Sequence, residues 1–221
     1  MRIPPTEIKP SGYRGAPDCL PSRRAQAPCY TGRMRTLSVF NQVSLDGFFS
    51  TPTGDMAWMH RSDQDAQLRE FVAGNAAGES VLVFGRKTYD LMAAFWPTPA
   101  AAAQMPAVAR GMNAAPKLVF SRTLTRATWS GSTILRGDPV SELGRLKDEP
   151  GAPLVILGSG SLVGPLAAAG LIDEYQVLVL PVVLGVGRTM FSGLDRPVDL
   201  ALKSTRAFRS GQVFLVYEPG R

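Results

Sequence analysis

Three short stretches of the chain carry residue types that bind phosphate groups, and each comes directly after a predicted strand. They are Gly85-Arg86-Lys87-Thr88, Ser121-Arg122 and Gly158-Ser159-Gly160-Ser161. Glycine lets the backbone approach a ligand closely, and the first N–H groups of a helix are free to bind an anion. Arginines beside hydroxyl groups suit a further phosphate monoester. An adenine dinucleotide with a 2′-phosphate requires this set of groups.

The last of these stretches follows the clearest strand pattern in the sequence. Residues 154–157 form a short apolar run bounded by Pro153 and Gly158, which predicts a strand buried on both faces of a parallel sheet. The serines that follow are expected to cap the next helix. An ordinary strand-to-helix turn that binds nothing is the alternative, because a single GxG motif is a weak signal.

Strands alternate with helices along most of the chain. Strands are predicted over residues 36–43, 80–84, 117–121, 133–135, 154–157, 173–180, 200–208 and 212–217. Helices are predicted from a cap at Ser62 or Asp63 to about residue 76, from 85 to 97, over 100–112 and 139–147, and from the glycine-serine stretch to Gly170. This order predicts an α/β fold with a mostly parallel sheet flanked by helices. The last two strands are expected to form an antiparallel C-terminal hairpin at the sheet edge.

Composition favours one folded domain and a tail. The chain has 221 residues, of which 45% are hydrophobic and 19% charged, enough for one sizeable core. Residues 1–33 are rich in Pro, Gly, Arg and Ser, which predicts a disordered tail before a single domain over 34–221. Met34 stands just before the first strand, so the tail is also interpretable as an upstream extension from a misplaced start codon.

The net charge of +6 does not indicate a nucleic-acid surface, because the excess lies in or beside the tail. The basic residues there are Arg2, Lys9, Arg14, Arg23, Arg24, Arg33 and Arg35. Both cysteines, Cys19 and Cys29, are also in the tail, so no metal site is expected in the core. No apolar stretch is long enough for a membrane helix or resembles a signal peptide. A cytoplasmic protein without nucleic-acid or membrane partners is expected.

Several motifs, taken in order, resemble one enzyme superfamily. The segments around 83–89, 118–122 and 156–162 are similar to dihydrofolate reductase and, more closely, to the reductase domain of the bifunctional riboflavin-biosynthesis deaminase-reductase. The segments 44–47 and 170–187 strengthen the likeness, which covers about residues 34–218. The resemblance implies a dihydrofolate reductase-like fold.

The resemblance also implies NADPH as the cofactor. It places Arg86 and Thr88 on the phosphates, Ser121 and Arg122 near the adenosine 2′-phosphate, and residues 158–162 around the pyrophosphate. The cofactor-binding residues that we expect are Gly85, Arg86, Lys87, Thr88, Ser121, Arg122, Gly158, Ser159, Gly160, Ser161 and Leu162.

Two places in the chain offer a carboxylate for a catalytic role. Dihydrofolate reductases use a carboxylate from the first helix, and this sequence offers Asp63 or Asp65 there. Asp46 follows the first strand, beside the expected nicotinamide end of the cleft, although it is equally suited to cap a turn with Gly47. The riboflavin reductases have an acidic residue where this chain has Leu157, and no deaminase zinc ligands are present.

These observations predict an NADPH-dependent reductase of a small nitrogen heterocycle, pterin-like or aminopyrimidine-like. The resemblance implies 5-amino-6-(5-phosphoribosylamino)uracil reductase-type activity. The alternatives are a dihydrofolate reductase proper and a non-catalytic nucleotide-binding module of the same fold. A homodimer is expected, because the apolar run 177–186 and the terminal hairpin would leave an apolar sheet edge exposed.

Overall fold

The computed structural model describes residues 35–55, 57–62, 65–194 and 196–220, which all fall within one compact unit. The main strands are β1 (Leu37–Ser44), β3 (Val81–Gly85), β4 (Lys117–Phe120), β5 (Ser132–Leu135), β6 (Leu154–Leu157), β7 (Glu174–Leu180), β9 (Leu200–Ala207) and β10 (Val213–Pro219). Two short strands, β2 (Phe48–Ser50) and β8 (Arg188–Thr189), pair separately. The predicted tail over residues 1–33 lies outside the described residues, so the domain division stays a prediction.

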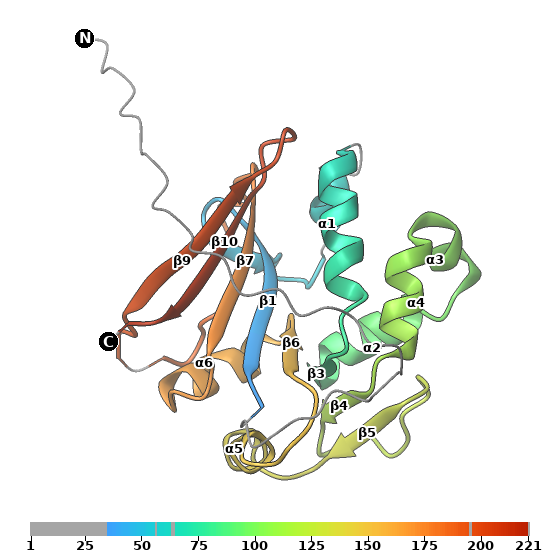
Figure 1. Ribbon diagram of the computed structural model, residues 1–221, viewed down its shortest axis with the longest axis vertical. Helices are drawn as coiled ribbons and strands as arrows, with labels where there is room; N and C mark the ends of the chain where they lie inside the picture. The colour runs from blue at the N-terminus through green and yellow to red at the C-terminus, as the bar shows by residue number, and fades with distance from the viewer. Residues whose placement is uncertain (1–34, 56, 63–64, 195, 221) are drawn as a thin grey trace, which may run out of the picture. The chain divides into compact units, whose positions relative to one another are not determined.

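The main strands form one sheet of eight strands in the order β5-β4-β3-β6-β1-β7-β10-β9 (Figure 1). The six strands from β5 to β7 are parallel, whereas β10 pairs antiparallel with β7 and with β9. The predicted fold class is therefore confirmed, including the antiparallel C-terminal hairpin at the sheet edge.

Helices cover both faces of this sheet (Figure 1). They are α1 (Ala66–Ala76), α2 (Arg86–Phe95), α3 (Pro99–Gln104), α4 (Pro106–Ala114), α5 (Pro139–Lys147) and α6 (Gly160–Ala168), with a 3-10 helix at Ala57–Ser62. On one face α5 and α6 pack through Leu143 and Val163 against the central strands. On the other face α2 and α4 form one cluster with β3 and β4, and α1 forms a second with β7 and β10.

Two helix boundaries differ from the predictions. The helix α1 begins at Ala66, because the carboxylate of Asp65 accepts the N–H groups of Gln67 and Leu68 at 2.9 and 3.2 Å. The predicted cap at Ser62 or Asp63 is wrong. The alanine-rich segment forms two helices instead of one, since Pro106 has no N–H to donate and begins α4.

Lys117 is a buried cation at the start of β4. Only 1% of the residue is exposed, and its ammonium group donates to the carbonyls of Asn113 at 2.9 Å and Ser130 at 3.0 Å. The ammonium also lies 4.4 Å from the centre of the Trp129 ring. Burial lowers the pKa of Lys117 from 10.5 to about 8.

This lowered pKa predicts that stability rises with pH between about 8 and 10.5. In that interval the unfolded chain binds the lysine proton more tightly than the folded protein, so deprotonation relieves the cost of burying the charge. The free energy of unfolding is expected to rise by up to about 3 kcal/mol, and Lys117→Met should lack this rise. Urea unfolding of both proteins across the interval measures the difference. Parallel pH dependences would contradict the prediction.

Candidate functional site

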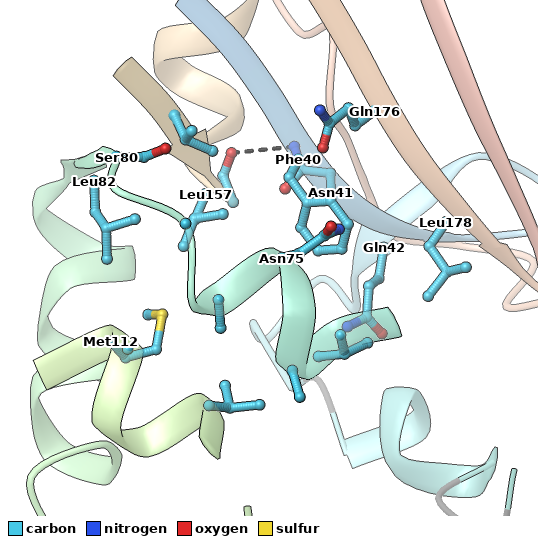
Figure 2. A pocket seen from close by; sticks show the side chains of 18 of the residues that line it. Phe40, Asn41, Gln42, Asn75, Ser80, Leu82, Met112, Leu157, Gln176 and Leu178 are labelled. Atoms are coloured by element: carbon cyan, nitrogen blue, oxygen red, sulfur yellow. Dashed lines mark hydrogen bonds between the residues drawn. The ribbon is translucent and has the colours of Figure 1, made fainter. Parts of the chain in front are cut away.

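A cavity of about 1010 Å³ lies over the sheet face that carries α1, α2 and α4. Its floor comes from β6, β1 and β7, and its walls come from α1 on one side and from α2 and α4 on the other. Figure 2 shows Phe40, Gln42 and Gln176 at this cavity, with Asn75 coming from α1. The cavity lies between the two apolar clusters of that face.

Alternate residues of β1 face the core on one side of the sheet and the cavity on the other. Leu37 and Val39 are fully buried in the cluster beneath α5 and α6. Ser38, Phe40 and Gln42 alternate with them and line the cavity on the opposite face. Polar residues therefore occur in a strand of otherwise apolar composition.

The N-termini of α2 and α6 meet where β3 and β6 end. The Ser159 hydroxyl accepts the Gly85 N–H at 2.9 Å and donates to the Leu157 carbonyl at 3.0 Å. The Ser159 N–H in turn donates to Thr88 Oγ1 at 3.1 Å. Because Gly85 and Thr88 belong to the start of α2, these hydrogen bonds hold the two helix N-termini side by side.

Ser159 does not cap α6 with its side chain, so the expected serine cap is corrected there. The residue has φ 54° and ψ 48°, and its hydroxyl bridges the two helix starts instead. The first N–H groups of a helix generally lack an intrahelical acceptor, although the Leu162 N–H in the first turn of α6 donates to the Ser159 carbonyl at 2.7 Å. Two positive helix ends therefore point to the same edge of the sheet, as a bound pyrophosphate would require.

Gly158 links this edge to the cavity. It lines the cavity, and its carbonyl accepts the side-chain amide of Asn41 at 3.2 Å (Figure 2). Its φ is 60°, and an added Cβ would lie 2.9 Å from Cγ2 of Thr88. Both the backbone conformation and the neighbouring side chain therefore require glycine here.

The predicted cofactor residues of α2 differ in exposure. Gly85 is buried, Lys87 is exposed, and Thr88 is half-buried against Gly158. The Arg86 guanidinium pairs with the Asp90 carboxylate at 2.6 Å along the helix surface. A phosphate bound by Arg86 would therefore contact a guanidinium that already pairs with Asp90.

The predicted residues after β4 and in α6 also fall into different environments. The Ser121 hydroxyl accepts the N–H groups of Thr123 and Leu124, at 3.3 and 2.9 Å, whereas the Arg122 side chain is exposed. Gly160 and Leu162 are buried, and the Leu162 side chain belongs to the core under α6. Ser161 is exposed at the helix start. No described contact tests whether any of these residues binds a cofactor.

Asp46 bridges two loops. Its carboxylate accepts the N–H of Leu184 at 3.2 Å and that of Gly185 at 2.7 Å. Hydrogen bonding lowers the pKa of Asp46 below its ordinary value. The Ser44 hydroxyl has the largest effect, and these N–H groups have smaller ones. The residue is exposed, so it remains ionised at neutral pH and is poorly suited to donate a proton. Its catalytic role stays a prediction.

The other catalytic candidate, Asp63, lies outside the described residues. Within the described part of the chain, the carboxylates lining the cavity are Asp173 and Glu174, at the N-terminal end of β7. Asp173 pairs with Lys147, and Glu174 pairs with Lys203. The cavity-lining residues of α1 include Leu68, Val72 and Asn75 but no described acid.

Sequence reasoning did not identify the amide side chains of the cavity. The lining residues with amide side chains are Asn41, Gln42, Asn75, Gln104, Gln176 and Gln212. Polar residues at alternate positions of β1 and β7 are the signal that points to them, but a solvent-facing strand has the same pattern. Among the described residues, no group of three or more His, Cys, Asp or Glu side chains could hold a metal ion. None of the described helices has the length and apolar character needed to span a bilayer.

Comparison with protein families matches residues 35–214 to the RibD C-terminal domain. The uncharacterized protein YyaP of Bacillus subtilis is 29% identical over 175 residues, which cover 79% of this chain and 90% of YyaP. The uncharacterized protein YwjB of the same organism is 41% identical over 64 residues, which cover 29% of this chain and 37% of YwjB.

Solved structures show the same fold. A putative riboflavin biosynthesis protein from Shewanella sp. PV-4 has a TM-score of 0.63 at 21% identity, covering 84% of this chain and 99% of that protein. Dihydrofolate reductase from Enterococcus faecalis, complexed with NADP(H) and RAB-propyl, has a TM-score of 0.57 at 14% identity, with 86% and 99% covered. A pyrimidine reductase-like protein from Corynebacterium diphtheriae has a TM-score of 0.53 at 12% identity, with 89% and 96% covered. The dihydrofolate reductase-like fold is thereby confirmed.

Proposed function

This chain belongs to the RibD C-terminal domain family, and from that premise we propose that it is an NADPH-dependent reductase of a small nitrogen heterocycle. One observation carries the proposal: Gly158 lines the large cavity and directly precedes Ser159, where two helix N-termini meet. A cofactor whose pyrophosphate lies on the helix ends could therefore extend its reactive ring into the cavity.

The residues at the helix ends fit a dinucleotide. A Cβ added at Gly85 would lie 3.6 Å from the Ser161 hydroxyl, so the two turns approach closely without a side chain between them. The first N–H groups of α2 and α6, apart from the Leu162 N–H that donates to the Ser159 carbonyl, are available to anionic oxygens. Arg122 is exposed after β4, the neighbour of β3, and supplies a guanidinium for a 2′-phosphate. NADPH is favoured over NADH on that ground.

The chain's own residues would bind and orient two rings and exclude water. Bound NADPH would supply the hydride. The apolar side chains of Phe40 and Leu178 offer surface for a flat ring. The hydrogen bond from the Asn41 side chain holds the Gly158 carbonyl beside the N-termini of α2 and α6. Holding two rings in a reactive arrangement accounts for much of the rate in such a site.

A nucleotide-binding module without turnover is the second candidate. The observation that favours it is the lack of a described carboxylate on the cavity face of α1, where a proton donor would be placed. The same observation weighs against a dihydrofolate reductase proper. The proposal still includes 5-amino-6-(5-phosphoribosylamino)uracil reductase-type activity, in which the substrate is an aminopyrimidine.

A single assay separates these functions. The protein is incubated with NADPH, or with NADH, and a panel of pterins and aminopyrimidines while the absorbance of the reduced nicotinamide is followed. Consumption of NADPH with one of the heterocycles supports the reductase, and binding without consumption supports the module. Equal affinity for NADPH and NADH would contradict the proposed role of Arg122.

We also propose that the chain forms a homodimer. Leu45, Val183 and Val186 are exposed by 68%, 65% and 62% at neighbouring loops joined by the Leu45 N–H to Val182 carbonyl bond. The edge strand β9 is exposed along nearly its whole length. Apolar loops and an unpaired strand edge favour association. Light scattering is expected to give twice the chain mass of 23.7 kDa, and the mass of one chain would contradict the dimer.

A further inference from the structure

One half of the cavity is lined by apolar residues alone. It lies over β3 and β6 and beneath α2 and α4, and the described lining residues on these four elements have neither charged nor amide side chains. Figure 2 shows Leu82, Leu157 and Met112 on one side of the cavity, with Gln42 and Gln176 on the other. We call this part the apolar half. Its floor is formed by Leu82, Val155 and Leu157, and its walls include Leu91, Met92 and Met112.

The register of the sheet shows where the lining changes character. Leu82 of β3 pairs with Val155 of β6, and Val155 pairs with Ser38 of β1. Ser38 in turn pairs with Glu174 of β7. Neighbouring strands lie about 4.8 Å apart, so these four strands span roughly 14 Å. A ligand lying across the floor would therefore contact apolar groups with one end and polar groups with the other.

The apolar half contains side chains that the protein leaves partly uncovered. Leu154 and Ile156 of the central strand β6 are fully buried on one face of the sheet, whereas Val155 and Leu157 on the cavity face are only half-buried. Leu91 of α2 is 50% exposed. A central parallel strand is normally covered on both faces. Apolar surface left open in such a place marks a ligand-binding groove.

The apolar half is also closed above and offers no partner for a charge. There is no room for a side chain at Gly111 of α4 against the carbonyl of Ala76 of α1, so these two cavity walls meet. The charged residues of the lining come from α1, β9 and the start of β7, and they are Arg69, Asp173, Glu174 and Lys203. A phosphate or carboxylate in the apolar half would lose its hydration without meeting an opposite charge.

We propose that the apolar half binds an uncharged aromatic or alkyl substituent of a ligand whose heterocycle lies over β1 and β7, beside Gln42 and Gln176. The cavity volume of about 1010 Å³ is at the top of the range of about 300–1,000 Å³ for drug-sized ligands, which leaves room for such a substituent. The substrate class is then a heterocycle with an apolar substituent, and a phosphoribosyl group is disfavoured. The identification of the ligand as the substrate rests on the proposed reductase function, whereas its binding does not.

Pterin, 6-phenylpterin and pterin-6-carboxylate provide matched probes, because they share one heterocycle and differ in one substituent. Fluorescence titration of the full chain without NADPH is expected to show 6-phenylpterin binding at least about tenfold more tightly than pterin. The carboxylate, which is ionised near neutral pH, should bind no more tightly than pterin. Equal affinities for pterin and 6-phenylpterin would overturn the inference. A carboxylate that binds as tightly as the phenyl compound would do the same, and so would no 6-phenylpterin binding up to about 0.1 mM.

A substitution that fills the apolar half tests its location. Ala107 of α4 is half-buried and lines the cavity, so Ala107→Trp would occupy the space of the phenyl group. The variant is expected to bind 6-phenylpterin about tenfold more weakly and pterin within about twofold of the unmutated protein. Ala114→Trp makes the same change on an exposed residue of α4 outside the lining, and it should change neither affinity. Unchanged 6-phenylpterin affinity in Ala107→Trp would overturn the inference.

A second substitution changes polarity instead of volume. Leu157→Gln places an amide on the floor of the apolar half and should also weaken 6-phenylpterin binding by about tenfold. Leu202→Gln makes the same change on a residue of β9 that is 55% exposed and outside the lining, so its affinities should equal those of the unmutated protein. If Leu157→Gln does not fold, Ala107→Trp decides alone. Full 6-phenylpterin affinity in folded Leu157→Gln would contradict the assignment of the apolar half.

The outcomes also separate this inference from the reductase proposal. NADPH consumption with a pterin, without any preference for the phenyl compound, would leave the reductase standing and remove the apolar half as a binding site. A preference for 6-phenylpterin that both substitutions abolish, in a protein that does not consume NADPH, would leave the apolar half standing and remove the reductase.

Discussion

Gly158→Val is expected to lower the thermal midpoint and the dinucleotide affinity of the protein together. A side chain at φ 60° costs about 1–2 kcal/mol, and the added atoms would meet Thr88, whose Cγ2 is 2.9 Å from an ideal Cβ. Overpacking adds about 1–3 kcal/mol. The total predicts a fall of roughly 10 °C in the midpoint for a chain of this size. Differential scanning calorimetry and NADPH titration measure the two effects.

Gly170 provides the matched control. It has φ 66°, close to that of Gly158, but an added Cβ there meets nothing within 4 Å. Gly170→Ala should therefore show only the cost of the backbone conformation, and Gly158→Ala should show that cost plus the contact with Thr88. Thr88→Ser removes the methyl group and keeps the hydroxyl that accepts the Ser159 N–H, so it should partly rescue Gly158→Ala. Equal midpoints for the two alanine variants would contradict the packing role of Gly158.

The sequence predicts those elements best whose ends are marked locally. The strand β6 and the helix α5 match their predicted ranges, because Pro153 and Gly158 bound the first and Asp138 with Pro139 begins the second. The start of α1 was mispredicted because several residues there are good caps. Asp65 is selected by distant contacts, since the backbone N–H and hydroxyl of Ser210 bind its second oxygen. Hydrogen bonding lowers the pKa of Asp65 to about 2, and the bonds from Ser210 have the largest effect.

The same distinction applies to the candidate site. The sequence places glycines, hydroxyls and arginines after the ends of parallel strands, and the neighbouring strands β3 and β6 bring two of those stretches together. The bridging role of Ser159 depends on Gly85, 74 residues earlier, so no local pattern reveals it.

Ser159→Ala is expected to destabilise the junction of α2 and α6 and to weaken dinucleotide binding. The substitution leaves the buried N–H of Gly85 without its acceptor and the carbonyl of Leu157 without its donor. Each buried group left unpaired costs about 1–3 kcal/mol, so a midpoint fall of several degrees is expected. NADPH affinity should fall as well, because the hydroxyl fixes the distance between the two helix ends that would hold the pyrophosphate.

Two further serine variants show which property of Ser159 matters. Ser161→Ala makes the same chemical change on an exposed residue of α6 and should leave the thermal midpoint unchanged. Ser159→Gly also removes the hydroxyl but relieves the cost of φ 54°, so it should melt above Ser159→Ala by the equivalent of about 1 kcal/mol. A midpoint for Ser159→Ala equal to that of the unmutated protein would show that the bridge contributes nothing, and the two helix ends would then have to be held by the strands alone.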